Sequence, residues 1–474
     1  MADPGGLRDE LTEALDAATR SAHRYLGGLD RSPVVGADAV AALDRLAGPL
    51  PGTGDGAVAA LRELAEVGDA AATRSGGPRF FHFVAGGATP AALGADWLTS
   101  TYDQVAFSWV SSAMGARLDQ VATAWLRELF ELPDAYHGFL VSGATMANFT
   151  GLAAARNWWA EQLGVDVEHH GLAGLPAPSI FTSGYVHPSA VQAVGMLGFG
   201  RGNVRRLVQD ATGRLDLDGL AAALHAADGP AILIANAGEA NTGAFDPIAE
   251  MAELAQRHRA WLHVEGAFGL FARLSPATRR LTDGIDRADS LACDAHKWLN
   301  VPYDCGFGFV RDPSRLASAF TLGTGAASAR GGFPDPAELV PENSRRARSL
   351  AVWATLRAYG RDGYRAMVER HLGLARHLAT RLAATGDFEL LAQVPLNIVC
   401  FRARPADVPE DGLDALNVAL GEDLLRDGRV YAGTTVYRGV VAFRPAIVNW
   451  RSTEADVDLL VEVLRELLAQ RLSA

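Results

Sequence analysis

The chain of 474 residues is 49% hydrophobic and 21% charged, with a formal net charge of -12 at pH 7. This composition is typical of an acidic globular protein and excludes the strongly basic surface of nucleic-acid-binding proteins. No apolar run reaches the roughly 18 residues of a membrane-spanning helix, and the acidic first residues lack the parts of a signal peptide. We therefore expect a cytoplasmic protein without membrane or nucleic-acid partners.

The first predicted elements are helical. Residues 7–25 and 36–67 carry Leu, Ala and Val at helical spacing, with charged residues between them. This pattern predicts a helical N-terminal arm, which we assign to residues 1–90.

From about residue 135, short apolar runs alternate with amphipathic helical segments. Such alternation predicts an α/β domain with a mostly parallel sheet and helices on both faces, because each crossover returns over one face. We assign this domain to residues 91–345 and expect its ligand at the carboxyl ends of the strands. The seven predicted strands are 137–141, 179–182, 204–208, 231–237, 261–265, 290–294 and 306–310.

The remainder, residues 346–474, predicts a smaller α+β domain. It contains a long helical segment at 346–384, short strands near 396–402 and 436–444, and a final amphipathic helix at 454–470.

The three cysteines are Cys293, Cys305 and Cys400, and each lies in an apolar stretch far from the others. Their odd number and their separation argue against a disulfide framework or a zinc site. We predict that they are core residues and that the protein binds no metal.

A first candidate site follows the strand at 137–141. The strand runs into Ser-Gly-Ala144-Thr145 and then into a helix, so backbone N–H groups, the Thr145 hydroxyl and the helix dipole can together bind a phosphate. The simpler interpretation is an ordinary strand-to-helix turn with a Ser or Thr cap.

Three further side chains lie where strands end or helices begin. His187 precedes Pro188 at a predicted helix start, where its ring can lie against a planar ligand or simply cap the helix. Glu265 ends an apolar strand, which argues for partial burial and a cationic partner rather than an exposed loop position. Lys297 lies between apolar residues after the strand at 290–294, where an ammonium group is costly without a partner or a reaction.

The order of these features is more informative than any one of them. A phosphorylated aromatic aldehyde needs an anion site, a face for its ring, a counter-ion for its ring nitrogen and an amine. The motifs SGATMAN, HPSAVQA, HVEGAFG, DAHKWL and SRRARSLAVWA moreover resemble the group II pyridoxal-phosphate-dependent amino-acid decarboxylases. That family includes the aromatic amino-acid, tyrosine, histidine and glutamate decarboxylases.

The resemblance implies fold type I, a pyridoxal 5'-phosphate cofactor, an amino-acid substrate and a homodimer whose arm packs on the partner. It implies that the enzyme decarboxylates the substrate with Lys297 and His187 as catalytic residues. Lys297 would form the Schiff base, His187 would stack on the cofactor ring and Glu265 would face the ring nitrogen. The remaining cofactor-binding residues would be Ala144, Thr145 and His296 at the phosphate, with Asp294 where the family has Asn or Asp.

Three positions differ from the family pattern. Glu265 replaces an aspartate, and Glu239-Ala240 replace two threonines. The loop 330–346 has Phe333 as its only aromatic residue, whereas aromatic amino-acid decarboxylases carry a proton-donating tyrosine there. Relatives without that tyrosine form an aldehyde with oxygen, so a decarboxylating oxidase (aldehyde synthase) is the alternative, and a weakly catalytic cofactor-binding homologue is a second.

The substrate side chain is predicted to be apolar or aromatic. Phe83, Val84 and Trp109 lie in segments that match the substrate-facing stretches of the family, although core packing explains such residues equally well. Arg444 has the planar fork that holds a carboxylate, but an ordinary ion pair is the simpler interpretation.

Overall fold

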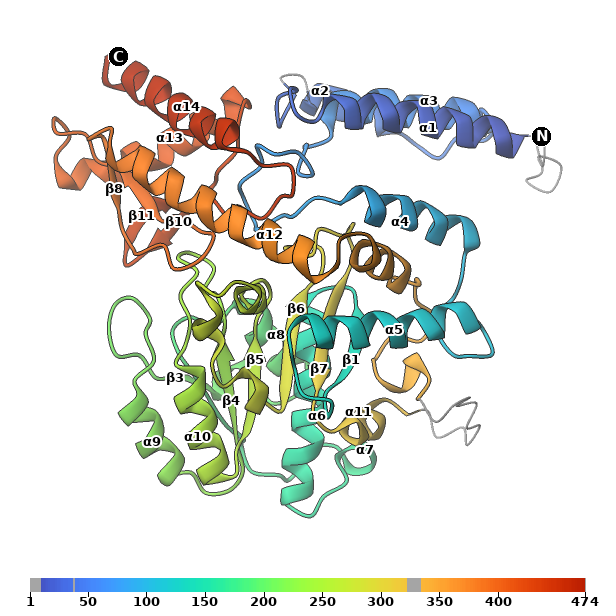
Figure 1. The fold of residues 1–474 in the computed structure, drawn as a ribbon, viewed down its shortest axis with the longest axis vertical. Helices are drawn as coiled ribbons and strands as arrows, with labels where there is room; N and C mark the ends of the chain where they lie inside the picture. Colours follow the sequence, from blue (N-terminus) through green and yellow to red (C-terminus); the bar gives the residue numbers. More distant parts are fainter. Residues whose placement is uncertain (1–9, 37–38, 322–333, 474) are drawn as a thin grey trace.

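The computed structural model describes residues 10–36, 39–321 and 334–473 (Figure 1). Its N-terminal arm consists of α1 (Glu10–Gly28), α2 (Ala39–Leu43) and α3 (Ala57–Ala71). Helices α1 and α3 pack side by side, away from the central sheet (Figure 1). The predicted helical stretch 36–67 is wrong in its middle, because residues 47–56 contain two prolines and four glycines, which oppose helix formation.

Two capped helices connect the arm to the sheet. They are α4 (Pro90–Tyr102) and α5 (Ala113–Leu129). The Thr89 side chain accepts a hydrogen bond from the third residue of the first helix, and the Ser112 side chain does the same for the second. These caps satisfy N–H groups that have no partner inside a helix, and they fix where each helix begins.

The central sheet has seven strands, as the sequence predicts. Their order is β1-β7-β6-β5-β4-β2-β3, and only β7 runs antiparallel to its neighbours. The strands are β1 (His137–Val141), β2 (Ser179–Thr182), β3 (Val204–Arg206), β4 (Ala231–Asn236), β5 (Trp261–Glu265), β6 (Ser290–Asp294) and β7 (Gly306–Val310). The predicted fold class is confirmed.

Helices cover both faces of this sheet because alternate strand residues point to opposite sides. Leu233 and Leu262 pack in a core with α5, α9 and α10, whereas Ile232 and Ile234 pack in a second core with α6 and α8. These helices and their neighbours are α6 (Ala144–Gln162), α7 (Val167–His170), α8 (Pro188–Met196), α9 (Leu217–His225), α10 (Ile248–His258) and α11 (Pro313–Phe320).

The C-terminal part contains a four-stranded antiparallel sheet in the order β10-β11-β9-β8. The predicted long helix is α12 (Ser349–Ala383), but its backbone leaves helical geometry at Gly360, where φ is +58°. A helix that the sequence did not predict, α13 (Leu413–Asp427), packs beside the final helix α14 (Glu454–Ser473). The strands are β8 (Phe388–Leu390), β9 (Phe401–Ala403), β10 (Thr434–Tyr437) and β11 (Val440–Phe443). The division at residues 90 and 345 stays a prediction.

All three cysteines are buried free thiols, which confirms them as core residues. Within the described ranges, the structure contains no helix with the length and apolarity to cross a membrane.

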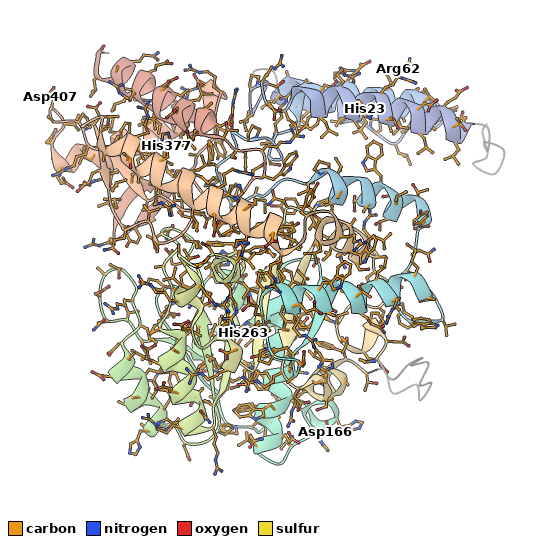
Figure 2. All side chains as sticks on the ribbon, in the orientation of Figure 1. His23, Arg62, Asp166, His263, His377 and Asp407 are labelled. Atoms are coloured by element: carbon orange, nitrogen blue, oxygen red, sulfur yellow. The ribbon has the colours of Figure 1, made fainter. Side chains whose placement is uncertain are left out.

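Two histidines are fully buried in the cores. His263 lies within the large domain (Figure 2), with Nδ1 2.7 Å from Ser290 Oγ and Nε2 2.8 Å from Asn148 Oδ1. His371 accepts a hydrogen bond from Trp298 Nε1 at 2.8 Å. Burial lowers the pKa of each imidazole from 6.5 to about 3.

Because these two histidines are neutral in the folded protein, we expect them to lower the free energy of unfolding as the pH falls. Between pH 6.5 and about 3 the unfolded chain binds protons that the folded histidines reject, so each histidine removes about 1.4 kcal/mol of stability per pH unit of acidification. Burial raises the pKa of Glu265 to about 7 and that of Asp246 to about 6, and these two groups act in the opposite direction. We therefore expect His371→Gln to reduce the slope of unfolding free energy against pH, measured by urea unfolding from pH 5 to 6.5.

Only the slope is compared, so any loss of absolute stability in the variant does not affect the result. The opposing carboxyl groups are common to both proteins and cancel in the difference. Equal slopes for the parent and the variant would contradict a neutral His371 in the folded state.

Candidate active site

Lys297 lies in the turn that follows β6, and it is the only lysine in the sequence. Its Nζ is 2.8 Å from Asp294 Oδ2. Burial by itself lowers the pKa of Lys297, but the Asp294 carboxylate and its hydrogen bond outweigh burial, so the pKa lies above its usual value. The costly ammonium group of the sequence thus has a carboxylate partner.

Asp294 connects this lysine to the predicted phosphate site. Its Oδ1 accepts a hydrogen bond from the backbone N–H of Ala144 at 2.5 Å and lies 3.4 Å from His296 Nε2. Four of the predicted site residues, from two distant segments, therefore meet at one carboxylate. Thr145, the other residue predicted to bind the phosphate, follows Ala144 as the second residue of α6.

The turn from β1 into α6 is tightly packed. A Cβ added at Gly143 would lie 3.3 Å from both Asp294 Oδ1 and His296 Cε1, and one added at Gly306 would lie 2.5 Å from the Gly143 backbone. No side chain caps α6 at Gly143. Ala144 N already donates to Asp294, so the amides that follow it in the first turn of this 19-residue helix are the ones that remain for an anion.

His187 is the N-cap of α8, and Pro188 is the first helical residue, as the sequence predicts. Its Nδ1 accepts a hydrogen bond from Ser189 N at 3.2 Å. The pKa of the imidazole is lowered, first by the protein that surrounds part of the ring and second by the charge of Lys297. The hydrogen bond from Ser189 N fixes the orientation of the ring.

Glu265 is the last residue of β5 and is 4% exposed. Its Oε1 accepts a hydrogen bond from Ala267 N at 3.1 Å. Burial raises the pKa of the carboxyl to about 7, and the charge of Lys297 opposes that rise. The sequence analysis expected a cationic partner for Glu265. Such a partner would lower the pKa of the carboxyl and favour its ionised form.

The three predicted substrate contacts have different surroundings. Phe83 is 61% exposed, and the centroid of its ring lies 3.8 Å from that of His82. Val84 is 3% exposed and packs in the main core. Trp109 lies between α4 and α5 and donates its backbone N–H to Asp335. Their contact with a substrate stays a prediction. Phe333 lies outside the described residues.

Glu239 and Ala240 form a turn after β4 without presenting a hydroxyl of their own. Glu239 Oε2 accepts hydrogen bonds from the Thr242 backbone at 2.8 Å and from the Thr242 hydroxyl at 3.0 Å. The Ala240 carbonyl accepts a hydrogen bond from Arg444 Nη1 at 2.9 Å. The two family threonines are thus replaced by a self-contained turn that Arg444 contacts.

Arg444 forms no ion pair with any residue that the structure describes, so the simpler interpretation made from the sequence is wrong. Its Nε is buried without a hydrogen-bond partner. Burial is the first cause of the low pKa of His82, about 4, and the charge of Arg444 is the second. The same charge contributes to the lowered pKa of His187.

Tyr303 is a neighbour of the site that the sequence analysis did not select. Its ring stacks on that of His296, with 4.2 Å between centroids. The sequence showed only that Tyr303 lies six residues after Lys297. The conformation of the turn between them decides where the tyrosine ring lies, and the sequence does not give that conformation.

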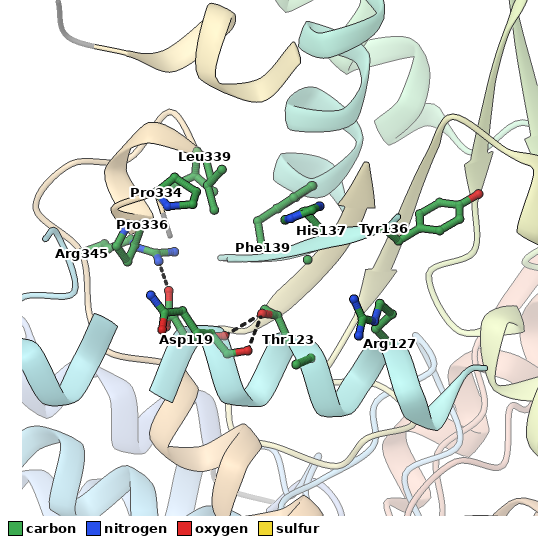
Figure 3. Close-up of a pocket in the computed structure, with 14 residues that line it drawn as sticks. Asp119, Thr123, Arg127, Tyr136, His137, Phe139, Pro334, Pro336, Leu339 and Arg345 are labelled. Carbon is green, nitrogen blue, oxygen red and sulfur yellow. Dashed lines mark hydrogen bonds and ion pairs between the residues drawn. The ribbon is translucent and has the colours of Figure 1, made fainter. Parts of the chain in front are cut away.

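A separate cavity of about 130 Å³ lies beside the edge strand β1 (Figure 3). Asp119 and Arg345 form a buried ion pair in its wall. None of the predicted site residues lines this cavity, so it is not part of the candidate active site.

The residues around Lys297 fit pyridoxal phosphate. The uncapped helix start suits a phosphate, the lone lysine suits an aldehyde, and the buried carboxyl of Glu265 suits a protonated ring nitrogen. Lys297, His187 and Glu265 belong to different strand-helix units, and all follow the carboxyl end of a parallel strand, where such sheets bind ligands.

Comparison with known proteins also indicates a pyridoxal-dependent decarboxylase. The family model described as the pyridoxal-dependent decarboxylase conserved domain matches residues 65–404. An L-2,4-diaminobutyrate decarboxylase of Rhizobium meliloti (strain 1021) is 32% identical over 88% of this chain and 83% of that protein. An aromatic-L-amino-acid decarboxylase of Bacillus atrophaeus is 29% identical over 80% of this chain and 79% of that protein.

Two further matches bear on the reaction product and the fold. A phenylacetaldehyde synthase of Petunia hybrida is 27% identical over 84% of this chain and 82% of that protein. The crystal structure of Oryza sativa TDC with PLP and tryptamine has a TM-score of 0.91 and 25% identity, and the match covers 99% of this chain and 100% of that one.

Proposed function

The chain belongs to the pyridoxal-dependent decarboxylase family and is a pyridoxal-phosphate-dependent amino-acid carboxy-lyase, and from this we propose that it acts on an apolar or aromatic L-amino acid with the cofactor attached at Lys297. The observation that carries the proposal is the contact of Asp294 with both Lys297 Nζ and Ala144 N. It joins the amine and the phosphate-binding helix start in one site.

When bound, pyridoxal phosphate supplies an aldehyde that reacts with amines and a ring that accepts the electrons released when a bond at Cα breaks. Asp294 holds the Lys297 ammonium and orients it. His187, fixed by its helix cap, would support one face of the cofactor ring. The buried carboxyl of Glu265 would stabilise a proton on the ring nitrogen.

The test is a panel of amino acids given to the cofactor-loaded enzyme and scored by release of carbon dioxide. Aromatic amino acids are expected to turn over fastest. A preference for diamino acids would contradict an apolar or aromatic substrate and favour the substrate class named for the Rhizobium relative.

An aldehyde product is the second candidate. Glu239 and Ala240 carry no hydroxyl where the family has two threonines, the loop 330–346 contains no tyrosine, and the Petunia relative is a phenylacetaldehyde synthase. In that reaction the amino acid, oxygen and water give an aldehyde, carbon dioxide, ammonia and hydrogen peroxide. Oxygen consumption equal to carbon dioxide release would establish it, and carbon dioxide release without oxygen consumption would establish the simple decarboxylase.

We also propose that Arg444 holds the α-carboxylate of the substrate. Its Nε is buried without a hydrogen-bond partner among the described residues, and its Nη1 donates to the Ala240 carbonyl in the turn that follows β4. Arg444→Gln is expected to lower kcat/KM by between about 10-fold and 100-fold, because a hydrogen bond to a charged group contributes roughly 1.5–3 kcal/mol. Steady-state kinetics on several substrates would measure the loss, which should be equal for all of them.

Arg402 provides the control, since it is a buried arginine that is ion-paired with Glu389 and Glu410. Arg402→Gln should lower thermal stability and leave KM unchanged. An unchanged kcat/KM in Arg444→Gln would contradict the proposal, and a loss confined to acidic substrates would indicate a side-chain carboxylate instead.

The homodimer implied by the family resemblance is part of the same proposal. Large apolar side chains are exposed on the arm and on α4: Leu11, Leu15, Leu64, Trp97 and Leu98. A second copy would cover such surfaces, and sedimentation at a mass of 50.1 kDa alone would contradict it. The cytoplasmic location stays a prediction.

A further inference from the structure

Asn300, three residues after Lys297, is fully buried, and its φ of +57° is in the left-handed region. Its Nδ2 lies 3.3 Å from the Lys297 carbonyl oxygen and 2.9 Å from those of Trp298 and Val448. Its Oδ1 accepts a hydrogen bond from Trp450 N at 3.0 Å. One side chain thus joins the lysine turn to the segment after β11.

A third segment packs on the same turn. The Thr89 N–H donates to the Asn300 carbonyl at 2.8 Å, and the Gly86 N–H donates to the His296 carbonyl at 3.4 Å. A Cβ at Gly86 would lie only 1.7 Å from the Lys297 carbonyl oxygen, so the two backbones are in direct contact. This segment also carries Phe83, a predicted substrate contact.

Asn449 closes the junction from the side of the small domain. Its Nδ2 donates to the carbonyls of Gly76 and Gly77, at 3.0 Å each, and its own carbonyl accepts a hydrogen bond from His371 Nε2 at 2.9 Å. His371 in turn holds the indole of Trp298, the residue after the lysine. The three segments 76–89, 296–300 and 446–450 are therefore linked through neutral, buried side chains.

We propose that Asn300 is a positioning residue that fixes the Lys297 turn relative to the segment 446–450 after β11. The proposal rests on the proposed role of Lys297. Because its side-chain hydrogen bonds join the carbonyls of Lys297 and Trp298 to Val448 and Trp450, their loss would displace the turn, and Nζ with it, relative to that segment. A displacement of about 1 Å at a reacting atom is enough to lower a rate by up to 100-fold.

Asn417 offers a matched control. It is also fully buried and makes three hydrogen bonds through its side chain, but two of them connect α13 to Ala403 of β9 and the third goes to Leu413 within α13, so all stay in the small domain. Replacing either asparagine with aspartate keeps the size and removes the two N–H donors. The two variants therefore share the cost to folding and differ in their distance from Lys297.

The experiment compares Asn300→Asp with Asn417→Asp in the cofactor-loaded enzyme. We expect Asn300→Asp to shift the pH midpoint of the cofactor absorbance, raise KM and lower kcat/KM at least about tenfold, because the lysine turn moves together with the segment 86–89 that is hydrogen-bonded to it. We expect Asn417→Asp to keep the parent midpoint and to stay within about twofold of the parent kinetics, since it acts only on stability.

Asn300→Gly is the second variant, because glycine adopts a positive φ freely and keeps the backbone of the turn. It should fold and show the same spectral and kinetic changes. Parent values of the midpoint and KM in Asn300→Gly, or equal changes in the two aspartate variants, would overturn the proposal. Borohydride reduction of the parent tests Lys297 separately: no adduct refutes the proposed function, whereas an adduct with unchanged Asn300 variants refutes only this inference.

Discussion

Lys297→Ala is expected to abolish covalent attachment of pyridoxal phosphate and to lower kcat by at least about 1000-fold, because the variant loses the nucleophile of the reaction. Since Lys297 is the only lysine, borohydride reduction of the parent should add one pyridoxyl group per chain, at a single peptide. Mass spectrometry of the intact protein and of its peptides measures both results.

Lys297→Arg is the matched control. It keeps a cation beside Asp294, whose Oδ2 is 2.8 Å from the parent Nζ, but it cannot form the covalent bond. It should fold and resemble the alanine variant in turnover. An adduct at a position other than Lys297 in the parent, or parent turnover in either variant, would contradict the assignment of the site.

Glu265→Gln should lower kcat/KM by about 100-fold to 1000-fold, because a buried charge that stabilises the reacting state is lost. The amide has nearly the same shape as the carboxyl and can still accept the hydrogen bond from Ala267 N. The loss would therefore report charge rather than packing. Steady-state kinetics and cofactor titration by absorbance would measure it.

Glu265→Asp restores the residue that the family carries at this position. It keeps the charge and removes one methylene. We expect activity within about tenfold of the parent, because the charge of the carboxylate contributes more to the rate than the length of its side chain. If the glutamine variant matched the parent while the aspartate variant did not, Glu265 would act through its length alone, and its pairing with the ring nitrogen would be refuted.

Features that depend on a short segment of the chain were predictable from the sequence. The seven strands, the turn into α6 and the cap at His187 were predictable because each depends on the spacing of apolar, small or cap residues within a short segment. The break of α12 at Gly360 and the interruption of the arm helix were missed, because the periodic pattern continues through glycine and proline more readily than the helix does.

The sequence by itself determined the family and the fold class, because ordered motifs record the chemistry that each position must support. Only the tertiary structure decided that Asp294 contacts both Lys297 and Ala144, which is 150 positions before it, that Arg444 has no ion-pair partner among the described residues, and that Val84 is core. The physical reason is that burial, pairing and orientation depend on which distant segments pack together. No local pattern of residues specifies those contacts.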